Sequence, residues 1–273
     1  MNNMPSCIIH EPEEVYHARS KSGEYMSSHM LSRFAEMPYK YWATITGLYS
    51  DPEKQEYAFG RAAHKLILEG RQAFNDSYVV SDGPTNERTG KPYGKDTKAY
   101  LDWLGCQTGE VITTADYNEM EAMNQSVAKH PEIPEELLKP GGEAECVVRA
   151  ELEGVPCQIR IDYFHPETGI VDLKTCRDIR FFDYDMRSFG YAFQMAFYRA
   201  VLRAACGGTE YPVHMVAVDK TPFHVAGYWQ IPAAELEVAE RINAAALRRF
   251  KTCAESGKWP TGYERKQIFT LNK

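Results

Sequence analysis

Two aspartates and a lysine on adjacent predicted strands are the residues of this sequence best suited to chemistry. Asp162 ends an apolar stretch, and a turn containing Gly169 separates it from Asp172 and Lys174. Strand side chains alternate between faces, so Asp172 and Lys174 point the same way while Leu173 points into the core. A hairpin would also bring Asp162 beside Asp172. Carboxylates bind hard cations, and a lysine can stabilise developing charge or position a water, so this set suits Mg²⁺-dependent phosphodiester hydrolysis.

Short patterns of this kind also occur in exposed, charged hairpins that have no chemical role. The surrounding sequence favours burial here, because residues 152–161 and 169–175 are rich in β-branched residues, as strands are. Charged groups inside such strands need a partner or a metal ion. The motif alone leaves both interpretations open.

Length and composition indicate a folded protein without a membrane span. The chain has 273 residues, of which 44% are hydrophobic and 12% aromatic, enough for a full core in one large domain or two small ones. It contains no run of 18 or more apolar residues, and residues 1–10 lack the features of a signal peptide. The seven cysteines form no C-x-x-C pair, which favours reduced thiols in a cytoplasmic protein over a zinc or iron–sulfur site.

The net charge of −7 does not by itself suggest nucleic-acid binding. The charge is uneven, however, and six basic residues against three acidic ones give a local +3 between residues 174 and 203. The basic residues are Lys174, Arg177, Arg180, Arg187, Arg199 and Arg203, and the acidic ones are Asp178, Asp183 and Asp185. Ordinary surface charge explains this stretch equally well.

Hydrophobic periodicity predicts the elements that must position these residues. We expect helices over 28–34, 38–42, 57–72, 97–104, 114–129, 191–205 and 233–255. We expect strands over 143–151, 155–164, 170–175, 213–219 and 224–231, the first three forming a meander. Residues 1–25 are expected to be an irregular lead-in, 82–95 a mobile basic loop, and 26–273 a single domain. Gly70 is expected to end the helix over 57–72.

Other residues outside the hairpin have types that suit a catalytic site. His64 lies in the predicted helix over 57–72, and Glu145 lies on the strand before the hairpin. Gln194 and Tyr198 are four residues apart on a predicted helix and therefore share a face. Each of these residues is individually more typical of an ordinary core or surface position.

Taken in chain order, these residues resemble the RecB-like branch of the PD-(D/E)XK nuclease superfamily. The similarity is closest to RecE-type exonucleases, which means the exonuclease VIII catalytic domain and its phage or prophage relatives. It covers residues 26–263 and rests on the blocks 26–34, 38–41, 60–64, 154–162, 171–175, 191–198 and 259–263. The resemblance implies an α/β (mixed α+β) fold with a restriction-endonuclease-like core, in which a mixed central sheet with an antiparallel meander is flanked by helices.

The same resemblance implies a role for each member of the motif. Asp162 and Asp172 would be the central metal ligands, together with the backbone carbonyl of Leu173 and the imidazole of His64. Lys174 would orient or help to deprotonate the attacking water. Two Mg²⁺ ions, roughly 4 Å apart, would take part, and Mn²⁺ would substitute because histidine is an unusual ligand for Mg²⁺.

Further residues match the family pattern with two departures. Glu145 would act through a metal-bound water, and Gln194 and Tyr198 would contact DNA or hold the lysine and the phosphate. Ile161 replaces the proline of the superfamily motif, which puts only the local backbone shape in doubt. Asp172 stands where many relatives have glutamate.

By resemblance, the substrate is linear double-stranded DNA, degraded 5′→3′ to leave 3′ single-stranded tails for homologous recombination. Partners would be a RecT-type single-strand annealing protein and further copies of the chain in a trimeric or tetrameric ring. The protein would be phage or prophage encoded and act in the bacterial cytoplasm. Basic residues that could grip DNA are Arg177, Arg180, Lys91 and Lys95.

Three alternatives remain at the level of sequence. A flap or single-strand DNA nuclease of the same superfamily is one, although such relatives often carry a four-cysteine cluster that is absent here. A catalytically inactive DNA-binding module is another, although the set of Asp162, Asp172 and Lys174 is intact. A sugar- or nucleotide-processing enzyme would need a phosphate loop or differently spaced acids, and the sequence contains neither.

Overall fold

A five-stranded mixed sheet forms the centre of the structure, a computed structural model that describes residues 4–52 and 55–268. Its strand order is β3-β4-β5-β6-β7, and their bounds are Glu143–Leu152, Val155–His165, Gly169–Cys176, Val213–Asp219 and Ala226–Gln230. The first three strands form the predicted antiparallel meander, β6 runs parallel to β5, and β7 returns antiparallel to β6. The expected fold class, a mixed sheet with a meander flanked by helices, is confirmed.

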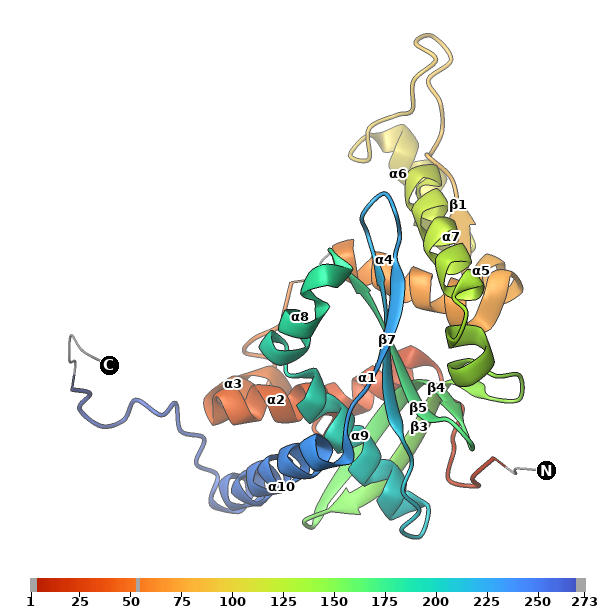
Figure 1. Ribbon diagram of the computed structural model, residues 1–273. Coiled ribbons are helices and arrows are strands. Elements are labelled where there is room, and N and C mark those ends of the chain that lie inside the picture. Colours follow the sequence, from red (N-terminus) through yellow and green to blue (C-terminus); the bar gives the residue numbers. More distant parts are fainter. Residues whose placement is uncertain (1–3, 53–54, 269–273) are drawn as a thin grey trace.

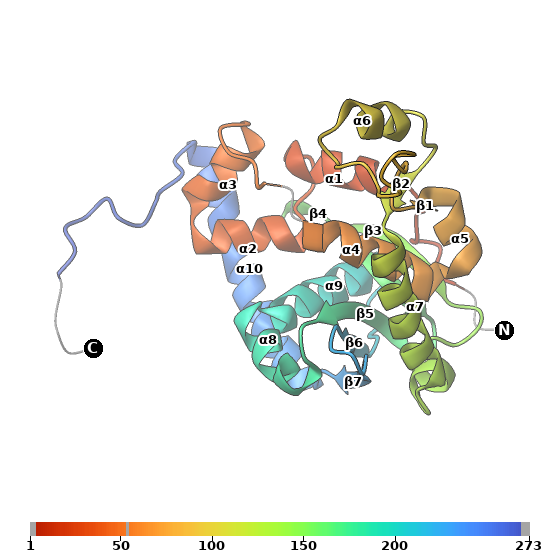
Figure 2. The same ribbon diagram turned by 90° about the horizontal axis from the view of Figure 1, so that it is seen from above.

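Helices cover both faces of this sheet (Figures 1 and 2). The helices α8 (Phe182–Ser188) and α9 (Tyr191–Ala205) form the crossover that the parallel pair β5–β6 requires. Helix α9 packs against β3 and β4, and α10 (Ala233–Ser256) packs outside it. On the other face, α7 (Thr114–Lys129) packs against β6 and β7 and against α4 (Gln55–His64).

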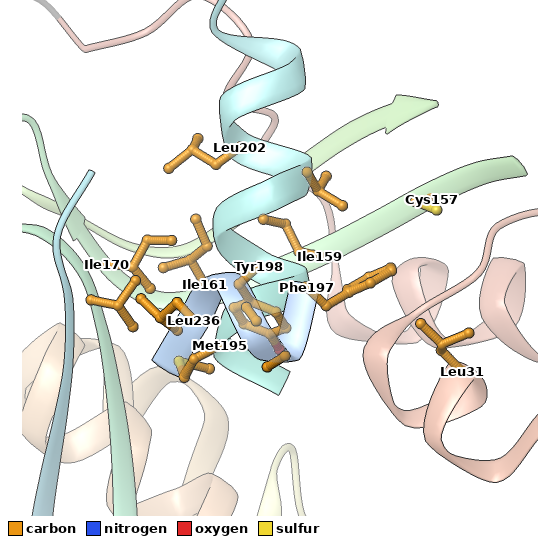
Figure 3. Packing of buried hydrophobic residues seen from close by; sticks show 14 of the residues in the cluster. Leu31, Cys157, Ile159, Ile161, Ile170, Met195, Phe197, Tyr198, Leu202 and Leu236 are labelled. Carbon is orange, nitrogen blue, oxygen red and sulfur yellow. The ribbon is translucent and has the colours of Figure 1, made fainter. Parts of the chain in front are cut away.

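The main core lies between α9 and the strands. Figure 3 shows Met195 and Leu202 of α9 close to Ile161 and Ile170 of the sheet. All four side chains are inaccessible to solvent. Since α9 also carries Gln194 and Tyr198, this packing fixes the position of both polar side chains relative to β4 and β5.

The predicted helices near the N-terminus are present. Helix α2 (Ser28–Glu36) is capped by Ser27, whose hydroxyl accepts a hydrogen bond from the Met30 amide. Helix α3 (Pro38–Ile45) begins with its proline. The predicted helix over 97–104 corresponds to α6 (Lys98–Leu104), capped by Thr97.

Two expectations about helices are wrong. Residues 1–25 are not an irregular lead-in, because residues 13–21 form helix α1 (Glu13–Lys21). Its polar sequence lacks an apolar stripe, so periodicity gave no signal. Gly70 does not end the helix over 57–72. Instead α4 ends at His64, a wider π-helical turn follows, and α5 (Gly70–Ser77) begins at Gly70, which has a φ of +86°. Residues 1–3, part of the predicted lead-in, lie outside the described residues.

The remaining segments lie at the periphery. A small parallel sheet pairs β1 (Tyr78–Val80) with β2 (Glu110–Ile112), strands too short for the sequence to predict. The loop between β1 and α6 projects from the body, and the chain after α10 extends away from it (Figure 1). Among the described residues, no helix combines the length and apolar character needed to cross a membrane.

Candidate active site

Three acidic residues lie close together on the adjacent strands β3, β4 and β5. The ladder between β3 and β4 is interrupted at Glu145 and Asp162, which lie between the pairs Ala144–Tyr163 and Cys146–Ile161. The register of β4 with β5 ends at the pair Tyr163–Val171, and Asp162 and Asp172 are the next residues on each strand. The two aspartates lie close enough for the charge of Asp162 to act on Asp172, as predicted for the hairpin, and it acts on Glu145 as well.

The acids lie where β4 and β5 separate. The two strands are paired only from the turn to Tyr163 and Val171, and beyond that point the Leu173 amide has no partner on β4. The Asp162 carboxylate takes this role, since its Oδ2 accepts a hydrogen bond of 2.8 Å from the Leu173 N–H. Asp162 thus stabilises the open end of the hairpin and is itself held in a fixed orientation.

Lys174 forms an ion pair with Asp172. Its Nζ is 2.6 Å from Asp172 Oδ2, and the Asp172 side chain is 1% exposed. The amide of Gln194 donates to Asp172 Oδ1 at 3.4 Å and to the Tyr198 hydroxyl at 3.3 Å. The Lys174 ammonium also lies 5.2 Å from the ring centre of Tyr191. Side chains of helix α9 therefore contact both Asp172 and Lys174. The predicted grouping of Asp172, Lys174, Gln194 and Tyr198 is present.

His64, the last residue of α4, contacts Asp162. Its Nδ1 is 3.5 Å from Asp162 Oδ2. Burial lowers the pKa of His64 to about 4, with Lys174 contributing in the same direction. At neutral pH the imidazole is therefore uncharged, and an uncharged imidazole is the form that can donate a lone pair to a metal ion.

Burial disfavours the charged form of all three acids. It raises the pKa of Glu145 to about 8 and that of Asp172 to about 6, and in both cases the charge of Asp162 adds to the increase. The pKa of Asp162 is also raised, chiefly by burial. Lys174 partly offsets the effect at both aspartates. A bound cation would stabilise the ionised carboxylates further.

The donor types fit a divalent cation. Carboxylates and a backbone carbonyl are ligands of Mg²⁺ and Mn²⁺, and a neutral imidazole suits Mn²⁺. The grouping is not a closed cage, however, because Asp172 is engaged by Lys174. Within residues 4–52 and 55–268, no three His, Cys, Asp or Glu residues stand close enough to form a complete metal site. His64 and Asp162 are the adjacent pair from which such a site would be built.

A cleft of about 1110 Å³ gives access to one side of these residues. His64, Glu145, Asp162 and Tyr198 line it. Among the described residues, the lining includes seven acids and four lysines or arginines, so the cleft is acidic. The acids are Glu11, Glu13, Glu14, Glu69, Glu110, Glu145 and Asp162, and the basic residues are Lys21, Arg61, Lys65 and Arg160. Asp172, Lys174 and Gln194 do not line the cleft.

Sequence reasoning missed two residues of this cleft. Arg160 Nε is 2.9 Å from Glu145 Oε2, and Arg160 Nη1 is 3.3 Å from Glu13 Oε2. Arg160 is two residues before Asp162 and therefore on the same face of β4, which was an available signal. Glu13 had no such signal because it comes from α1.

The backbone of Glu145 has an unusual conformation. Its φ is +57°, in the left-handed region that residues other than glycine rarely adopt. Such conformations cost roughly 1–3 kcal/mol and occur often at functional sites. The predicted strand position of Glu145 is present, with a local distortion that the sequence did not indicate.

The four predicted DNA-gripping residues do not line the cleft. Arg177 and Arg180 follow β5 on the surface, and the guanidinium of Arg180 is already paired with Asp178 at 2.6 Å. Lys91 and Lys95 are exposed in the loop that projects between β1 and α6 (Figure 1). A role in DNA binding stays a prediction for all four.

Comparison with known proteins identifies the family and the fold. A family model described as "PDDEXK-like domain of unknown function (DUF3799)" matches residues 27–271. The crystal structure of a protein from Eubacterium rectale, named "Putative exonuclease", is similar over 97% of each chain with a TM-score of 0.66. The two sequences are 16% identical, so this similarity shows a shared fold. No curated protein matches the sequence.

Proposed function

This chain belongs to the PDDEXK-like domain family DUF3799, within the PD-(D/E)XK nuclease superfamily, and from that premise we propose that it is a metal-dependent DNA nuclease. The observation that carries the proposal is the proximity of Glu145, Asp162 and Asp172, which come from three adjacent strands. Lys174 lies 2.6 Å from the last of these acids. A buried acid and two partly buried ones, all with raised pKa values and close to a lysine, are costly to maintain in a merely structural role.

The residues of the chain have distinct tasks in this proposal. His64, Asp162, Asp172 and the carbonyl of Leu173 would hold divalent cations, Mg²⁺ or Mn²⁺. When bound, these ions would lower the pKa of a water and stabilise charge on the phosphate. Asp162, fixed by the Leu173 amide, needs no reorientation. Lys174 would donate to the attacking water or to a phosphate oxygen, and its proximity to Asp172 keeps the ammonium charged.

Gln194 and Tyr198 hold the far side of the site. The Gln194 amide bridges Asp172 and the Tyr198 hydroxyl, so it restrains the carboxylate that pairs with Lys174. Glu145 lies close to Asp162 and would bind a metal-bound water. These contacts support an orienting role for both α9 residues, which needs no contact of their own with DNA.

A 5′→3′ exonuclease acting on linear duplex DNA is the finer form of the proposal. It rests on the sequence resemblance to RecE-type enzymes. The name of the similar Eubacterium rectale protein is consistent with exonuclease activity. In this form the enzyme leaves 3′ tails for a RecT-type annealing protein and works as a trimeric or tetrameric ring. Light scattering tests the ring, and a monomeric protein would contradict the proposal of a ring.

The test of the proposal is digestion of linear duplex DNA labelled at the 5′ or the 3′ end. We expect label release with Mg²⁺ or Mn²⁺ and none with EDTA. Lys174→Ala should lower the rate at least about 100-fold, because it removes a charge that acts in the transition state. Lys129→Ala, an exposed lysine at the end of α7, is the matched control and should behave as wild type.

Each other outcome selects a different function. Release from single-stranded or branched DNA only would select the flap or single-strand nuclease. DNA binding without cleavage of any substrate would select the inactive module. Full activity of folded Lys174→Ala would contradict the mechanism, and thermal unfolding must confirm that this variant is folded.

A further inference from the structure

Helix α1 lies before the matched region, residues 27–271, yet it is attached firmly to the strands of the site. Ile9 pairs with Val147 of β3 through backbone hydrogen bonds of 2.8 and 3.0 Å. Gln158 of β4 donates its side-chain amide to the Tyr16 carbonyl at 2.8 Å, and Tyr16 is buried. Glu11 also forms an ion pair with Arg149 of β3.

These attachments place Glu13 beside Arg160. Gln158 and Arg160 are two residues apart on β4 and both contact α1. Glu13 divides its two oxygens, with Oε1 3.2 Å from His17 Nε2 on the same helix and Oε2 3.3 Å from Arg160 Nη1. Glu13 therefore links its own helix to the strand that carries Asp162.

Arg160 in turn contacts Glu145. A guanidinium is a planar fork, so two carboxylates at different nitrogens fix its orientation better than one does. Arg160 forms ion pairs with Glu13 at Nη1 and with Glu145 at Nε, where among the described residues the contact has no hydrogen-bond geometry, and its side chain is only 18% exposed. The contacts form a chain from α1 through Arg160 to Glu145.

We infer that α1 is part of the active site and that Glu13 is a positioning residue, which holds Arg160 and through it orients the carboxylate of Glu145. This inference rests on the proposed nuclease function and assigns to it a segment that the family match does not include. Arg160 favours the ionised form of Glu145, and the contact with Glu13 restrains the position of the guanidinium in the cleft. The low pKa of Glu13, about 2, keeps it charged for this purpose.

The contacts between Glu13, Arg160 and Glu145 predict a specific kinetic signature. Groups that orient the residues of a metal site typically change activity or metal affinity by about 10- to 100-fold when removed. Glu13→Gln keeps the size of the side chain and removes its charge. We expect it to lower kcat about tenfold, to leave KM for duplex DNA within about twofold, and to weaken Mn²⁺ binding about tenfold.

The decisive measurement is a double-mutant cycle with Glu145→Gln. If Glu13 acts through Arg160 on Glu145, Glu13→Gln has no further effect on kcat once Glu145 is replaced. If α1 contributes only to the stability of the structure, Glu13→Gln should lower kcat by the same factor with and without Glu145→Gln. Arg160→Lys keeps the charge but loses the fork, and should recover only part of the activity lost in Arg160→Gln.

Controls separate this inference from the proposed function. Glu24→Gln removes an acid and its ion pair with Arg19 from the same segment, outside the cleft, and should match wild type. Mn²⁺ binding, followed by electron paramagnetic resonance without DNA, reports on the site even when no substrate is cleaved. Thermal unfolding identifies any variant that does not fold, and Arg160→Lys then replaces Glu13→Gln in the cycle.

Wild-type protein that cleaves DNA beside a Glu13→Gln variant with unchanged kcat and unchanged Mn²⁺ affinity would overturn the inference alone. Independent, multiplying effects in the cycle would do the same. Wild-type protein that cleaves no DNA with any metal would overturn the proposed function. In that case the Mn²⁺ affinities of Glu13→Gln and Glu24→Gln still decide whether Glu13 positions the site.

Discussion

At the scale of single residues, the site combines the buried Asp172 with two partly exposed acids, Glu145 and Asp162, that line the cleft. Asp172 is almost fully buried, and among the described residues its ion-pair partner is Lys174. Glu145 lies beside Arg160, which lowers its pKa without offsetting the effect of burial. The metal-free site is therefore electrostatically strained, and its stability depends on pH.

Stability of the metal-free protein should fall as the pH rises. The pKa of Glu145 is raised from 4.5 to about 8 in the folded state, so its contribution is present below pH 4.5 and is lost as the pH rises through 8. Asp172, raised to about 6, acts in the same direction. We expect the Tm in EDTA to decrease between pH 5 and 8.5.

The variant Glu145→Gln should flatten this dependence. Glutamine cannot ionise, so the variant should be more stable than wild type at pH 8.5 by a few kcal/mol at most, on the order of magnitude that such a pKa shift allows. Differential scanning calorimetry in EDTA measures both proteins. Wild-type and variant Tm values that change with pH in parallel would show that Glu145 is not the group responsible.

Asp162→Asn should separate the structural role of this residue from its role in metal binding. Asparagine still offers an oxygen to the Leu173 amide, so the fold should be retained. Loss of the charge should weaken Mn²⁺ binding at least about tenfold, as measured by calorimetric titration. Asp162→Ala also loses the acceptor and should cost about 1–3 kcal/mol more in unfolding free energy. Equal Mn²⁺ affinity in Asp162→Asn and wild type would exclude Asp162 as a ligand.

The sequence predicted part of the site for clear physical reasons. Asp162, Asp172 and Lys174 lie close together because strand alternation and a turn with Gly169 determine a hairpin from local information. Arg160 was missed because an arginine on a strand usually indicates a solvent-facing position. Glu13 was missed because its partner is distant in the sequence, and no local pattern encodes that contact.

At the scale of elements, the hairpin β4–β5 determines the site through its turn. Gly169 has a φ of +83°, and a Cβ built there would lie 2.2 Å from the Pro212 carbonyl oxygen. This close approach brings the start of β6 against the turn and so fixes the parallel register of β5 with β6.

Gly169→Ala should therefore destabilise the protein strongly. We expect a loss of about 3 kcal/mol or more in unfolding free energy, because backbone strain and overlap with rigid backbone atoms add together. Gly154→Ala is the matched control, with a similar φ of +76° but only the flexible Lys251 side chain nearby, and it should cost about 1 kcal/mol. Urea titration compares the two variants. Equal costs would mean that the contact with Pro212 does not fix the turn.

The sequence predicted strong elements better than weak ones. The sheet strands and α9 have clear apolar periodicity, and the structure confirms them. Helix α1 has only Tyr16 and Ser20 buried, so its helical form depends on contacts with β3 and β4. The π-helical turn after His64 interrupts the predicted continuous helix. A local change of helical pitch over one turn does not alter the hydrophobic periodicity of the sequence enough to be predicted.

At the scale of the whole molecule, the negative charge of the protein disfavours binding of DNA. The net charge is −7, and the cleft that leads to His64 and Asp162 is acidic. An acidic cleft repels a phosphate backbone unless cations are present. The protein is therefore expected to depend on divalent metal for binding DNA as well as for cleaving it.

Ca²⁺ should test this dependence, because it prefers the same oxygen ligands as Mg²⁺ but accepts looser geometry. We expect duplex DNA to bind at least about tenfold more tightly with Ca²⁺ than with EDTA, in fluorescence anisotropy at constant ionic strength. Asp162→Asn should lose most of this difference. Equal affinity with Ca²⁺ and EDTA would place the DNA-binding surface elsewhere, for instance on the loop with Lys91 and Lys95.

The order of the contributing segments along the chain has a consequence during protein synthesis. Glu13 and His64 emerge from the ribosome early, whereas Asp172 and Lys174 come from β5, whose parallel partner β6 follows only after α8 and α9. A nascent or prematurely terminated chain therefore holds isolated acids without the lysine that completes them. Under the proposed nuclease function, an incomplete chain would lack an assembled site, and the capacity to cut DNA would appear only when the sheet is complete.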